Sequence, residues 1–159
     1  MSQSPEQPKI AVRPAVRQDA DAVVALLRGL AVYENLQPPD DAAAARVTAD
    51  LFGETPRLSA LLADHDGQPA GLALFYETYS SFLGRPKLFL EDLFVLPEAR
   101  SLGVGRALFD AVVSEAKRRG CCRVEWVTLA NNHLGIRFYQ RAGAVHQADW
   151  QTWQILLDS

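Results

Sequence analysis

The sequence contains few of the residues that hold small secreted or metal-binding proteins together. Among its 159 residues are two cysteines and three histidines. Cys121 and Cys122 are adjacent, and neighbouring Cα atoms lie about 3.8 Å apart, less than the usual disulfide span of about 4.4 to 6.8 Å. The histidines are far apart and lack the paired spacing of a zinc site. The sequence therefore predicts no metal site, and a reducing compartment.

Positive charge and long apolar runs are also scarce. The formal net charge is −3, which argues against nucleic-acid binding, because such proteins usually concentrate basic residues on one face. A cationic substrate suits this balance better. No stretch approaches the roughly 18 consecutive apolar residues of a membrane span, and residues 1–8 lack the apolar run of a signal peptide. We expect a cytoplasmic protein with a flexible tail at residues 1–8.

The apolar pattern predicts one α/β domain over residues 9–159 with a mixed sheet. The predicted strands cover 9–13, 58–63, 70–79, 87–96 and 124–129, with two closing strands around 145 and at 152–157. The predicted helices cover 19–35, 40–52, 102–119 and 134–141. Asp19 and Asp40 or Asp41 are expected to cap the first two helices, and Gly53 to end the second in a left-handed conformation.

The most informative stretch covers residues 88–106, LFLEDLFVLPEARSLGVGR. Its first part is typical of an apolar strand that carries two carboxylates, Glu91 and Asp92, and its second part of a glycine-rich turn that opens a helix. A helix start offers backbone N–H groups to an anion, and small residues let a phosphate approach the main chain. Because the helix end alone contributes about 0.3 to 1 kcal/mol, Arg100 and Arg106 would be charge-assisted partners of a diphosphate.

Other interpretations of the glycine turn remain open. Gly103 and Gly105 could simply permit a tight connection between a strand and a helix. A Walker A loop is excluded, because it needs Lys followed by Ser or Thr at its end. A dinucleotide-binding fingerprint would place glycine where Leu108 stands, although Glu125 lies about twenty residues further on, the distance such folds use for a ribose contact. A dinucleotide-binding domain is therefore kept as an alternative.

The order of strand, RxxGxG turn, amphipathic helix, strand, and an Asn followed seven residues later by Tyr in NHLGIRFYQRAGA resembles the GNAT superfamily of acetyl-CoA-dependent N-acetyltransferases. The segments IAVRPA, LAVYEN, LEDLFVLPEAR and FYQRAGA are similar to its spermidine/spermine (diamine) branch and the thialysine relatives. The resemblance implies a single-domain GNAT fold, with a mixed, mostly antiparallel sheet of six or seven strands and about four helices. It also implies acetyl-CoA as co-substrate, a primary amine of a small molecule as acceptor, and a homodimer.

The resemblance further implies roles for particular residues. The cofactor-binding set is Leu93, Phe94 and Val95 for the pantetheine arm, Arg100, Ser101, Leu102, Gly103, Val104, Gly105 and Arg106 for the pyrophosphate, Asn132 and Gly135 to steady the cofactor, and Tyr139 to face its sulfur. The amine-binding set is Tyr33, Glu34, Tyr79, Glu91 and Asp92, and the choice of amine depends on how Tyr33, Glu34, Tyr76, Tyr79 and Phe82 converge.

Two positions depart from the family pattern. Ser101 replaces the usual glycine of the turn, which is tolerable if its backbone angles are ordinary. Ser80 stands where polyamine enzymes carry an aspartate, so one partner for a cation is lost. This second departure favours a shorter amine, such as a lysine analogue, a diamine or an amino acid side chain.

Transfer to an amine needs a base, because a primary alkylamine has a pKa of about 10.4. Strict alternation along the strand predicts two faces, one with Phe89, Glu91, Leu93 and Val95 and the other with Leu90, Asp92 and Phe94. At least one carboxylate is then expected in apolar surroundings, which raise a carboxyl pKa. We interpret Glu91 as the base, acting directly or through a water.

Tyr139 is interpreted as the acid that protonates the departing thiolate, and a main-chain N–H at residues 93–95 as the group that polarises the carbonyl. Blander interpretations remain for each residue. Glu91 or Asp92 could bind a local arginine, and Tyr139 could be an ordinary core tyrosine. A non-catalytic acyl-CoA-binding module is the alternative for the whole chain.

Overall fold

The computed structural model describes residues 9–157. Within this range, residues 9–127 form one compact unit and residues 128–157 a second. The first unit contains a sheet with helices on both of its faces, and the second contains one helix and the C-terminal segment. The tail expected at residues 1–8 lies outside the described residues.

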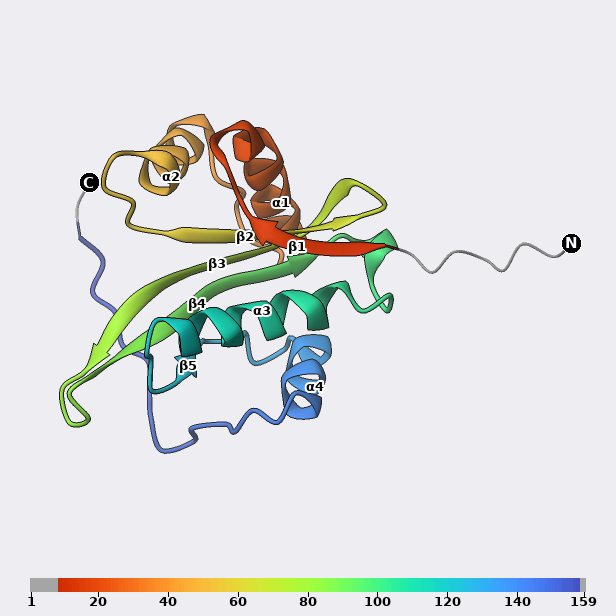
Figure 1. Ribbon diagram of the computed structural model, residues 1–159. Helices are drawn as coiled ribbons and strands as arrows, with labels where there is room; N and C mark the ends of the chain where they lie inside the picture. Colours follow the sequence, from red (N-terminus) through yellow and green to blue (C-terminus); the bar gives the residue numbers. More distant parts are fainter. Residues whose placement is uncertain (1–8, 158–159) are drawn as a thin grey trace, which may run out of the picture. The chain divides into compact units, whose positions relative to one another are not determined.

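The sheet has five strands among residues 9–157, in the order β1-β2-β3-β4-β5 (Figure 1). The strands are β1 (Ile10–Pro14), β2 (Ser59–His65), β3 (Gln68–Ser80), β4 (Arg85–Val95) and β5 (Val124–Glu125). The first four strands pair antiparallel, and β5 joins β4 in parallel. The mixed, mostly antiparallel sheet is therefore confirmed.

The expected count of six or seven strands is wrong for the described residues. β5 covers two residues of the strand predicted at 124–129, and residues 142–157 contain no helix or strand. Apolar side chains of this last segment stand open, with Trp153 85% and Ile155 88% exposed. Apolar residues stabilise a strand only where the strand pairs with a neighbour and buries one of its faces. Within residues 142–157 neither condition is met.

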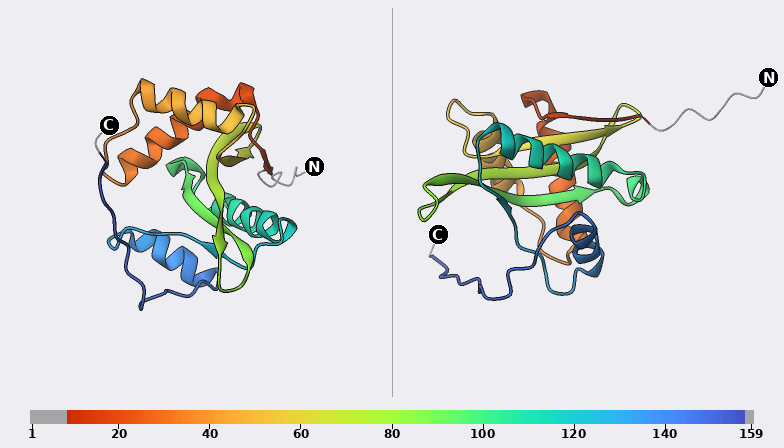
Figure 2. Two further views of the ribbon diagram at one scale, coloured as in Figure 1. Left: turned by 90° about the vertical axis from the view of Figure 1, so that its left-hand side faces the viewer. Right: turned by 60° about the horizontal axis from the view of Figure 1, so that its bottom comes forward.

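The helices are α1 (Ala20–Tyr33), α2 (Asp41–Phe52), α3 (Val104–Arg118) and α4 (His133–Arg141), with short 3₁₀ turns at η1 (Arg17–Asp19) and η2 (Pro97–Ala99). The four helices agree with the number expected. α1 and α2 cover one face of the sheet and α3 covers the other (Figure 2). Leu26 of α1 packs with Leu72 and Phe94 on the first face. No helix in residues 9–157 combines the length and apolar character needed to cross a bilayer.

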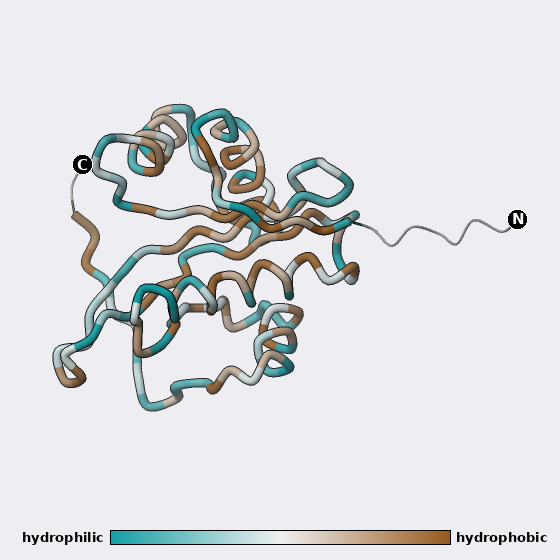
Figure 3. The backbone as a smooth tube through the Cα atoms, in the orientation of Figure 1, coloured by the Kyte–Doolittle hydropathy of each residue, from teal (hydrophilic) through white to brown (hydrophobic). Residues whose placement is uncertain are grey.

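Apolar residues concentrate along β2, β3 and β4 (Figure 3), as expected for strands covered on both faces. Gly71 on β3 permits a close approach of α3, because an added Cβ would lie 2.8 Å from Leu108 Cδ1 and 3.1 Å from Val104 Cγ1. α3 therefore begins immediately against the sheet, and its N-terminal turn is fixed by the core.

The predicted helix ends are confirmed in part. Asp40 caps α2, since its side chain accepts from the N–H of Ala43 at 2.7 Å. Asp19 precedes α1, but its carboxylate accepts from the N–H of Val16 at 2.8 Å and from Arg13, so it does not cap α1. Gly53 follows α2 with φ −74° and ψ 178°, so the left-handed ending predicted there is wrong.

Candidate active site

β4 carries the two predicted carboxylates and is interrupted by a bulge. Leu74 on β3 pairs with Asp92. The next residue of β3, Phe75, pairs with Leu90, so Glu91 is an extra residue with no partner on β3. A bulge resets the alternation of side chains beyond it. Asp92 therefore lies on the face of Leu74, and not on the face of Leu90 as strict alternation predicts.

The bulge brings both carboxylates to the face of the sheet that α1 and α2 cover. Leu74 and Phe94, which share this face with Asp92, belong to the cluster that packs against α1. Tyr76 lies two residues after Leu74 on β3, and its hydroxyl donates to Glu91 Oε2 at 3.1 Å. The predicted separation of Glu91 and Asp92 onto opposite faces is therefore wrong.

The two carboxylates differ in their surroundings. Asp92 is partly buried, whereas Glu91 is exposed. Burial, together with the negative charges of Glu91 and Glu34, raises the pKa of Asp92 from 3.8 to about 6. A carboxyl group with this pKa is mostly ionised at pH 7 yet can take up a proton readily. The surroundings therefore suit Asp92, more than Glu91, to the role of a base.

The C-terminal end of α1 contributes to the same region. Tyr33 is the last residue of α1, and its ring centroid lies 6.4 Å from that of Phe94 on β4. Glu34 follows, and burial raises its pKa. The charge of Glu34 acts on Asp92, so three carboxylates converge on one place. Such a group attracts an organic cation.

Tyr76 also belongs to this group, although the sequence analysis assigns it no definite role. Burial, followed by the charge of Glu91, raises the pKa of its hydroxyl, which therefore stays protonated and keeps donating to Glu91. No local signal in LEDL marks the bulge that brings Glu91 to Tyr76, since glycine and proline are both missing there. This contact depends on how β3 and β4 pair, which the sequence alone does not reveal.

Tyr79 and Phe82 do not join the carboxylates. Side chains alternate along β3, so Tyr79 lies on the opposite face from Tyr76, and it is 63% exposed. Phe82 lies in the β3–β4 hairpin and is 98% exposed. Ser80, the position of the expected polyamine aspartate, is buried instead. The structure thus keeps Tyr33, Glu34, Glu91 and Asp92 of the predicted amine set together and separates Tyr79 from them.

β4 has an open edge beside the carboxylates. β5 pairs with β4 only at Leu88 and Phe89, whereas β4 continues to Val95. Within residues 9–157, positions 90–95 of β4 pair with β3 on one side, except at the bulge residue Glu91, and with no strand on the other. Main-chain groups along such an edge can bind the amides of an extended ligand. This edge includes Leu93, Phe94 and Val95, the predicted contacts of a pantetheine arm.

The glycine turn between β4 and α3 has an unusual backbone. Ser101 has φ +62°, and Gly103, the N-cap of α3, has φ +91°. The condition set for Ser101, ordinary backbone angles, is therefore not met. No side chain among the described residues caps α3, and the first intrahelical bond runs from Ala107 N–H to Gly103 O at 3.0 Å. The N–H groups of residues 104–106 point out of the helix start, as a bound diphosphate requires.

The arginines that flank this turn are engaged within the protein. Arg106 pairs with Asp110 one helical turn later, with Nε 2.9 Å from both carboxylate oxygens. Arg100 donates through Nε to the carbonyl of Val95 at 3.0 Å. Its guanidinium carbon lies 4.6 Å from the ring centroid of Tyr33. The main chain of the turn therefore matches an anion site directly, while both arginine side chains already hold other partners.

The second unit contains the remaining predicted residues on one helix. Asn132 caps α4, because its side chain accepts from the N–H of Gly135 at 3.0 Å. Gly135 permits this approach, since an added Cβ would lie 2.7 Å from Asn132 Nδ2. Tyr139 lies two turns after Asn132, so the two side chains share a helix face, and its ring packs edge-on against Phe138 with centroids 5.3 Å apart.

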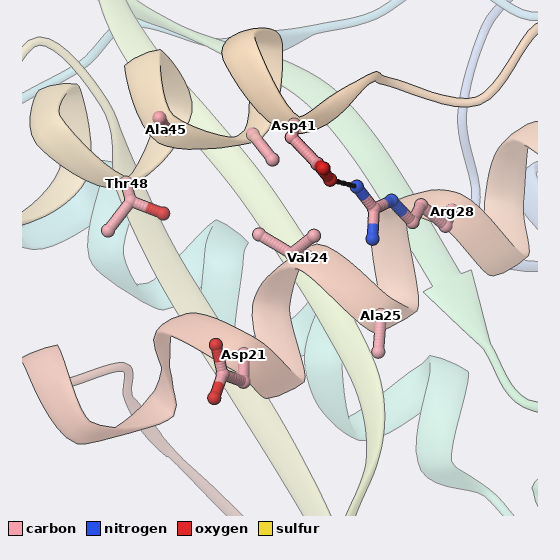
Figure 4. Close-up of a pocket in the computed structure, with 8 residues that line it drawn as sticks. Asp21, Val24, Ala25, Arg28, Asp41, Ala45 and Thr48 are labelled. Carbon is pink, nitrogen blue, oxygen red and sulfur yellow. Dashed lines mark hydrogen bonds and ion pairs between the residues drawn. The ribbon is translucent and has the colours of Figure 1, made fainter.

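A shallow pocket between α1 and α2 contains none of the predicted site residues in its lining (Figure 4). Its charged lining consists of Asp21, Arg28 and Asp41. Arg28 Nη2 binds Asp41 Oδ1 at 2.8 Å, and Arg28 Nε donates to the carbonyl of Pro39 at 3.2 Å. These contacts fasten the segment before α2 to α1, so the arginine in this pocket is used in holding the two helices together.

Comparison with known proteins assigns a family to this arrangement. Residues 23–144 match the family model described as Acetyltransferase (GNAT) family. A thialysine N-epsilon-acetyltransferase from Bos taurus is 31% identical over 152 residues, which cover 91% of this chain and 89% of that protein. An L-ornithine N5-acetyltransferase from Arabidopsis thaliana is 34% identical over 112 residues, 69% of this chain and 49% of that protein.

Solved structures agree with the fold. AAC(6')-Iy, in complex with the bisubstrate analog CoA-S-monomethyl-acetylneamine, has a TM-score of 0.74 at 23% identity, covering 94% of this chain and 99% of that structure. A probable acetyltransferase has a TM-score of 0.81 at 16% identity, with 94% and 99% covered. At these identities the likeness concerns the fold alone.

Proposed function

Since this chain belongs to the GNAT family, has the α/β GNAT fold and is an N-acetyltransferase, we propose that it transfers an acetyl group from acetyl-CoA to a primary amine of a small molecule. The observation that carries the proposal is the meeting of Glu34, Glu91 and Asp92 beside the open edge of β4. Three negative charges bind an ammonium group. The raised pKa of Asp92 provides a group that can accept its proton.

The cofactor contacts that we propose include residues of each unit. The open edge at residues 93–95 would bind the pantetheine arm, and the start of α3 would bind the diphosphate through its N–H groups. The proposed contacts also include Asn132, Gly135 and Tyr139, on the ground of the resemblance to the family. Bound acetyl-CoA supplies an activated acetyl group, and the chain supplies positions for it and for the amine.

Deprotonation of the amine is the first task of the site. At pH 7 a group with a pKa of about 10.4 is neutral in roughly one molecule in 10³, which corresponds to about 4.6 kcal/mol. We assign the proton to a carboxylate oxygen of Asp92, because burial and two neighbouring charges raise its pKa to about 6. Glu91, which Tyr76 holds by a hydrogen bond, would bind the ammonium or pass the proton through a water.

Protonation of the departing sulfur is the second task. A phenol with a pKa of about 10 can protonate a thiolate whose thiol has a pKa of about 8.5 without a large cost. We assign the donation of this proton to the hydroxyl group of Tyr139. The support is the family resemblance and the shared helix face with Asn132.

The acceptor that we favour is the side-chain amine of a basic amino acid or a short diamine. Two relatives are named for amines of this kind, thialysine and L-ornithine. Ser80 is buried and uncharged at the position where polyamine enzymes carry an aspartate, so a second cationic group finds no carboxylate there.

The test is release of CoA, measured with a thiol reagent, over lysine analogues, ornithine, diamines, polyamines and peptide N-termini. We expect turnover with the amino acids and short diamines and a higher KM for spermidine and spermine. Tight binding of CoA without thiol release from any amine would favour an acyl-CoA-binding module instead. A preference for spermine would refute the assigned role of Ser80.

Assembly and location form the rest of the proposal. A homodimer is implied by the family resemblance, and the large exposed apolar side chains at Trp150, Trp153 and residues 155–157 supply surface for a partner. Both cysteines are free thiols, as in a reducing cytoplasm. Light scattering after size-exclusion chromatography should give twice the mass of the chain. A monomer at all concentrations would refute the dimer.

A further inference from the structure

The guanidinium of Arg100 lies against two aromatic rings. Its Cζ atom is 4.6 Å from the ring centroid of Tyr33 and 5.7 Å from that of Phe94. Its Nε donates to the carbonyl of Val95 at 3.0 Å. The side chain is partly buried in this position. Arg100 thus binds the last residue of α1 and the last two residues of β4 at once.

These contacts join two parts of the site that the chain order keeps apart. Arg100 follows η2 and begins the turn that leads to α3. Tyr33 ends α1 and directly precedes Glu34, whose charge acts on Asp92. α1 ends here, because Asn35 has φ +57° and the N–H of Leu36 bonds back to Ala31 O at 2.8 Å. The contacts of Tyr33 with Phe94 and Arg100 anchor this end of α1 beside β4.

We propose that Arg100 is a positioning residue for the amine side of the site: it holds Tyr33, and with it Glu34, in place over β4. This inference rests on the proposed function. It differs from the role implied by the family resemblance, in which Arg100 binds the pyrophosphate. The distinguishing observation is that the guanidinium stacks on Tyr33 and bonds to Val95, whereas the main chain at residues 103–106 is what faces an anion.

Lysine separates the two roles at this position. Lysine retains the positive charge that a phosphate ligand needs, but it has no planar group to stack on a ring while a second nitrogen donates to a carbonyl. Arg100→Lys should therefore keep affinity for CoA and lose the placement of Tyr33. Tyr33→Leu removes the ring and should produce the same defect from the other side. Tyr33→Phe retains the ring face.

The experiment measures both halves of the site for each variant. CoA affinity is measured by calorimetry, and steady-state rates are measured against the best amine at saturating acetyl-CoA. For Arg100→Lys we expect a Kd for CoA within about threefold of the wild type and a rise of tenfold or more in KM for the amine, with a smaller change in kcat. Arg118→Lys, an exposed arginine at the other end of α3, is the matched control and should change neither value.

A double-mutant cycle tests the contact itself. If Arg100 acts through Tyr33, the variant carrying both Arg100→Lys and Tyr33→Leu should be little worse toward the amine than either single variant. Arg100→Lys in a Tyr33→Phe background should show the full loss. Circular dichroism and thermal unfolding establish that each variant is folded before its kinetics are compared.

The outcomes separate this inference from the function on which it rests. Loss of CoA affinity in Arg100→Lys with an unchanged KM for the amine would overturn it and restore a phosphate role. Additive effects of the two substitutions would also overturn it. Both results presuppose an active wild type, so they leave the acetyltransferase proposal standing. A wild-type chain that acetylates no amine would overturn both.

Discussion

Asp92, the base that we propose, lowers the stability of the fold when it is ionised. Its pKa lies above the ordinary carboxyl value because burial and two like charges disfavour its ionised form. The folded protein therefore binds a proton at Asp92 more tightly than the unfolded chain does. Between pH 3.8 and about 6 this group lowers the free energy of unfolding as pH rises, and the loss is complete above about 6.

Asp92→Asn should stabilise the protein at pH 8 and abolish most of its activity. The shift from 3.8 to about 6 corresponds to about 3 kcal/mol, and the gain should vanish near pH 4, where the wild-type carboxyl group is also neutral. The measurement is the difference in free energy of unfolding between variant and wild type across this range, which cancels the effects of other groups. A difference that does not change with pH would contradict the assigned pKa.

The pH dependence of activity distinguishes the two candidate bases. If Asp92 accepts the proton, kcat/KM for the amine should fall below a pH of about 6 in the wild type, and Glu91→Gln should keep this limb but move it to lower pH, because the charge of Glu91 raises the pKa of Asp92. Asp92→Asn should lack that limb. Loss of the limb in Glu91→Gln alone would assign the base to Glu91, as the sequence indicates.

Tyr139→Phe should lower kcat by about 10²- to 10⁴-fold with little change in the Kd for CoA. The physical reason is the loss of one hydroxyl proton while the ring and its packing on Phe138 remain. Stopped-flow single turnovers would show whether the chemical step is affected. Tyr79→Phe, which removes a hydroxyl on the opposite sheet face from the carboxylates, is the control, and an unaltered rate for Tyr139→Phe would remove Tyr139 from the mechanism.

Ser101→Gly should stabilise the protein by about 0.5 to 1 kcal/mol. Ser101 has φ +62°, a conformation that costs a residue with a Cβ about 1 to 2 kcal/mol, while glycine loses part of this gain through its greater freedom in the unfolded chain. Gly103→Ala, two residues later at φ +91°, should have the opposite sign. Chemical denaturation measures both, and equal stability of the three proteins would show that the turn carries no strain.

At the scale of residues, composition and motif identify which side chains matter, but not how they meet. The sequence points to Glu91 and Asp92 as a pair. It separates them onto opposite faces of the sheet, which is wrong, because the bulge at Glu91 has no glycine or proline to mark it. Likewise RSLGVG marks the turn, while the contact of Arg100 with Tyr33 depends on the end of a helix about seventy residues earlier.

At the scale of elements, α4 offers a test of a cap that also belongs to the predicted cofactor set. Asn132→Ala should cost about 1 kcal/mol of stability, because the N–H of Gly135 loses its acceptor. Asn132→Asp keeps an acceptor oxygen and should retain the cap, but it removes the amide N–H donors. Unfolding free energies and CoA titrations of both variants separate the two roles. Full CoA affinity in Asn132→Asp would limit Asn132 to the cap.

The elements themselves follow from local patterns wherever those patterns are long. α3 has apolar residues at three- and four-residue spacing and a glycine at its start, and its range agrees with the prediction to within two residues. β3 and β4 agree equally well. The closing strands around 145 and at 152–157 are not found, because their patterns are short and the described chain offers no neighbouring strand to pair with them.

At the scale of the whole molecule, ligand binding should report which cofactor the glycine turn accepts. CoA at about 100 times its Kd should raise the free energy of unfolding by about 2.7 kcal/mol. The reason is that the proposed CoA contacts, the N–H groups at the start of α3 and the edge of β4, are arranged for binding only in the folded chain. Thermal unfolding with CoA and with NAD at equal concentration makes the comparison. A larger shift with NAD would support the dinucleotide alternative.

The uneven pairing of β4 has a practical consequence for purified material. Six consecutive residues of this strand, 90–95, present main-chain groups on a side that no other described strand occupies. Unpaired strand edges promote association between copies of a protein. Storage buffers containing CoA should therefore suppress turbidity on concentration, whereas ligand-free stocks should precipitate sooner.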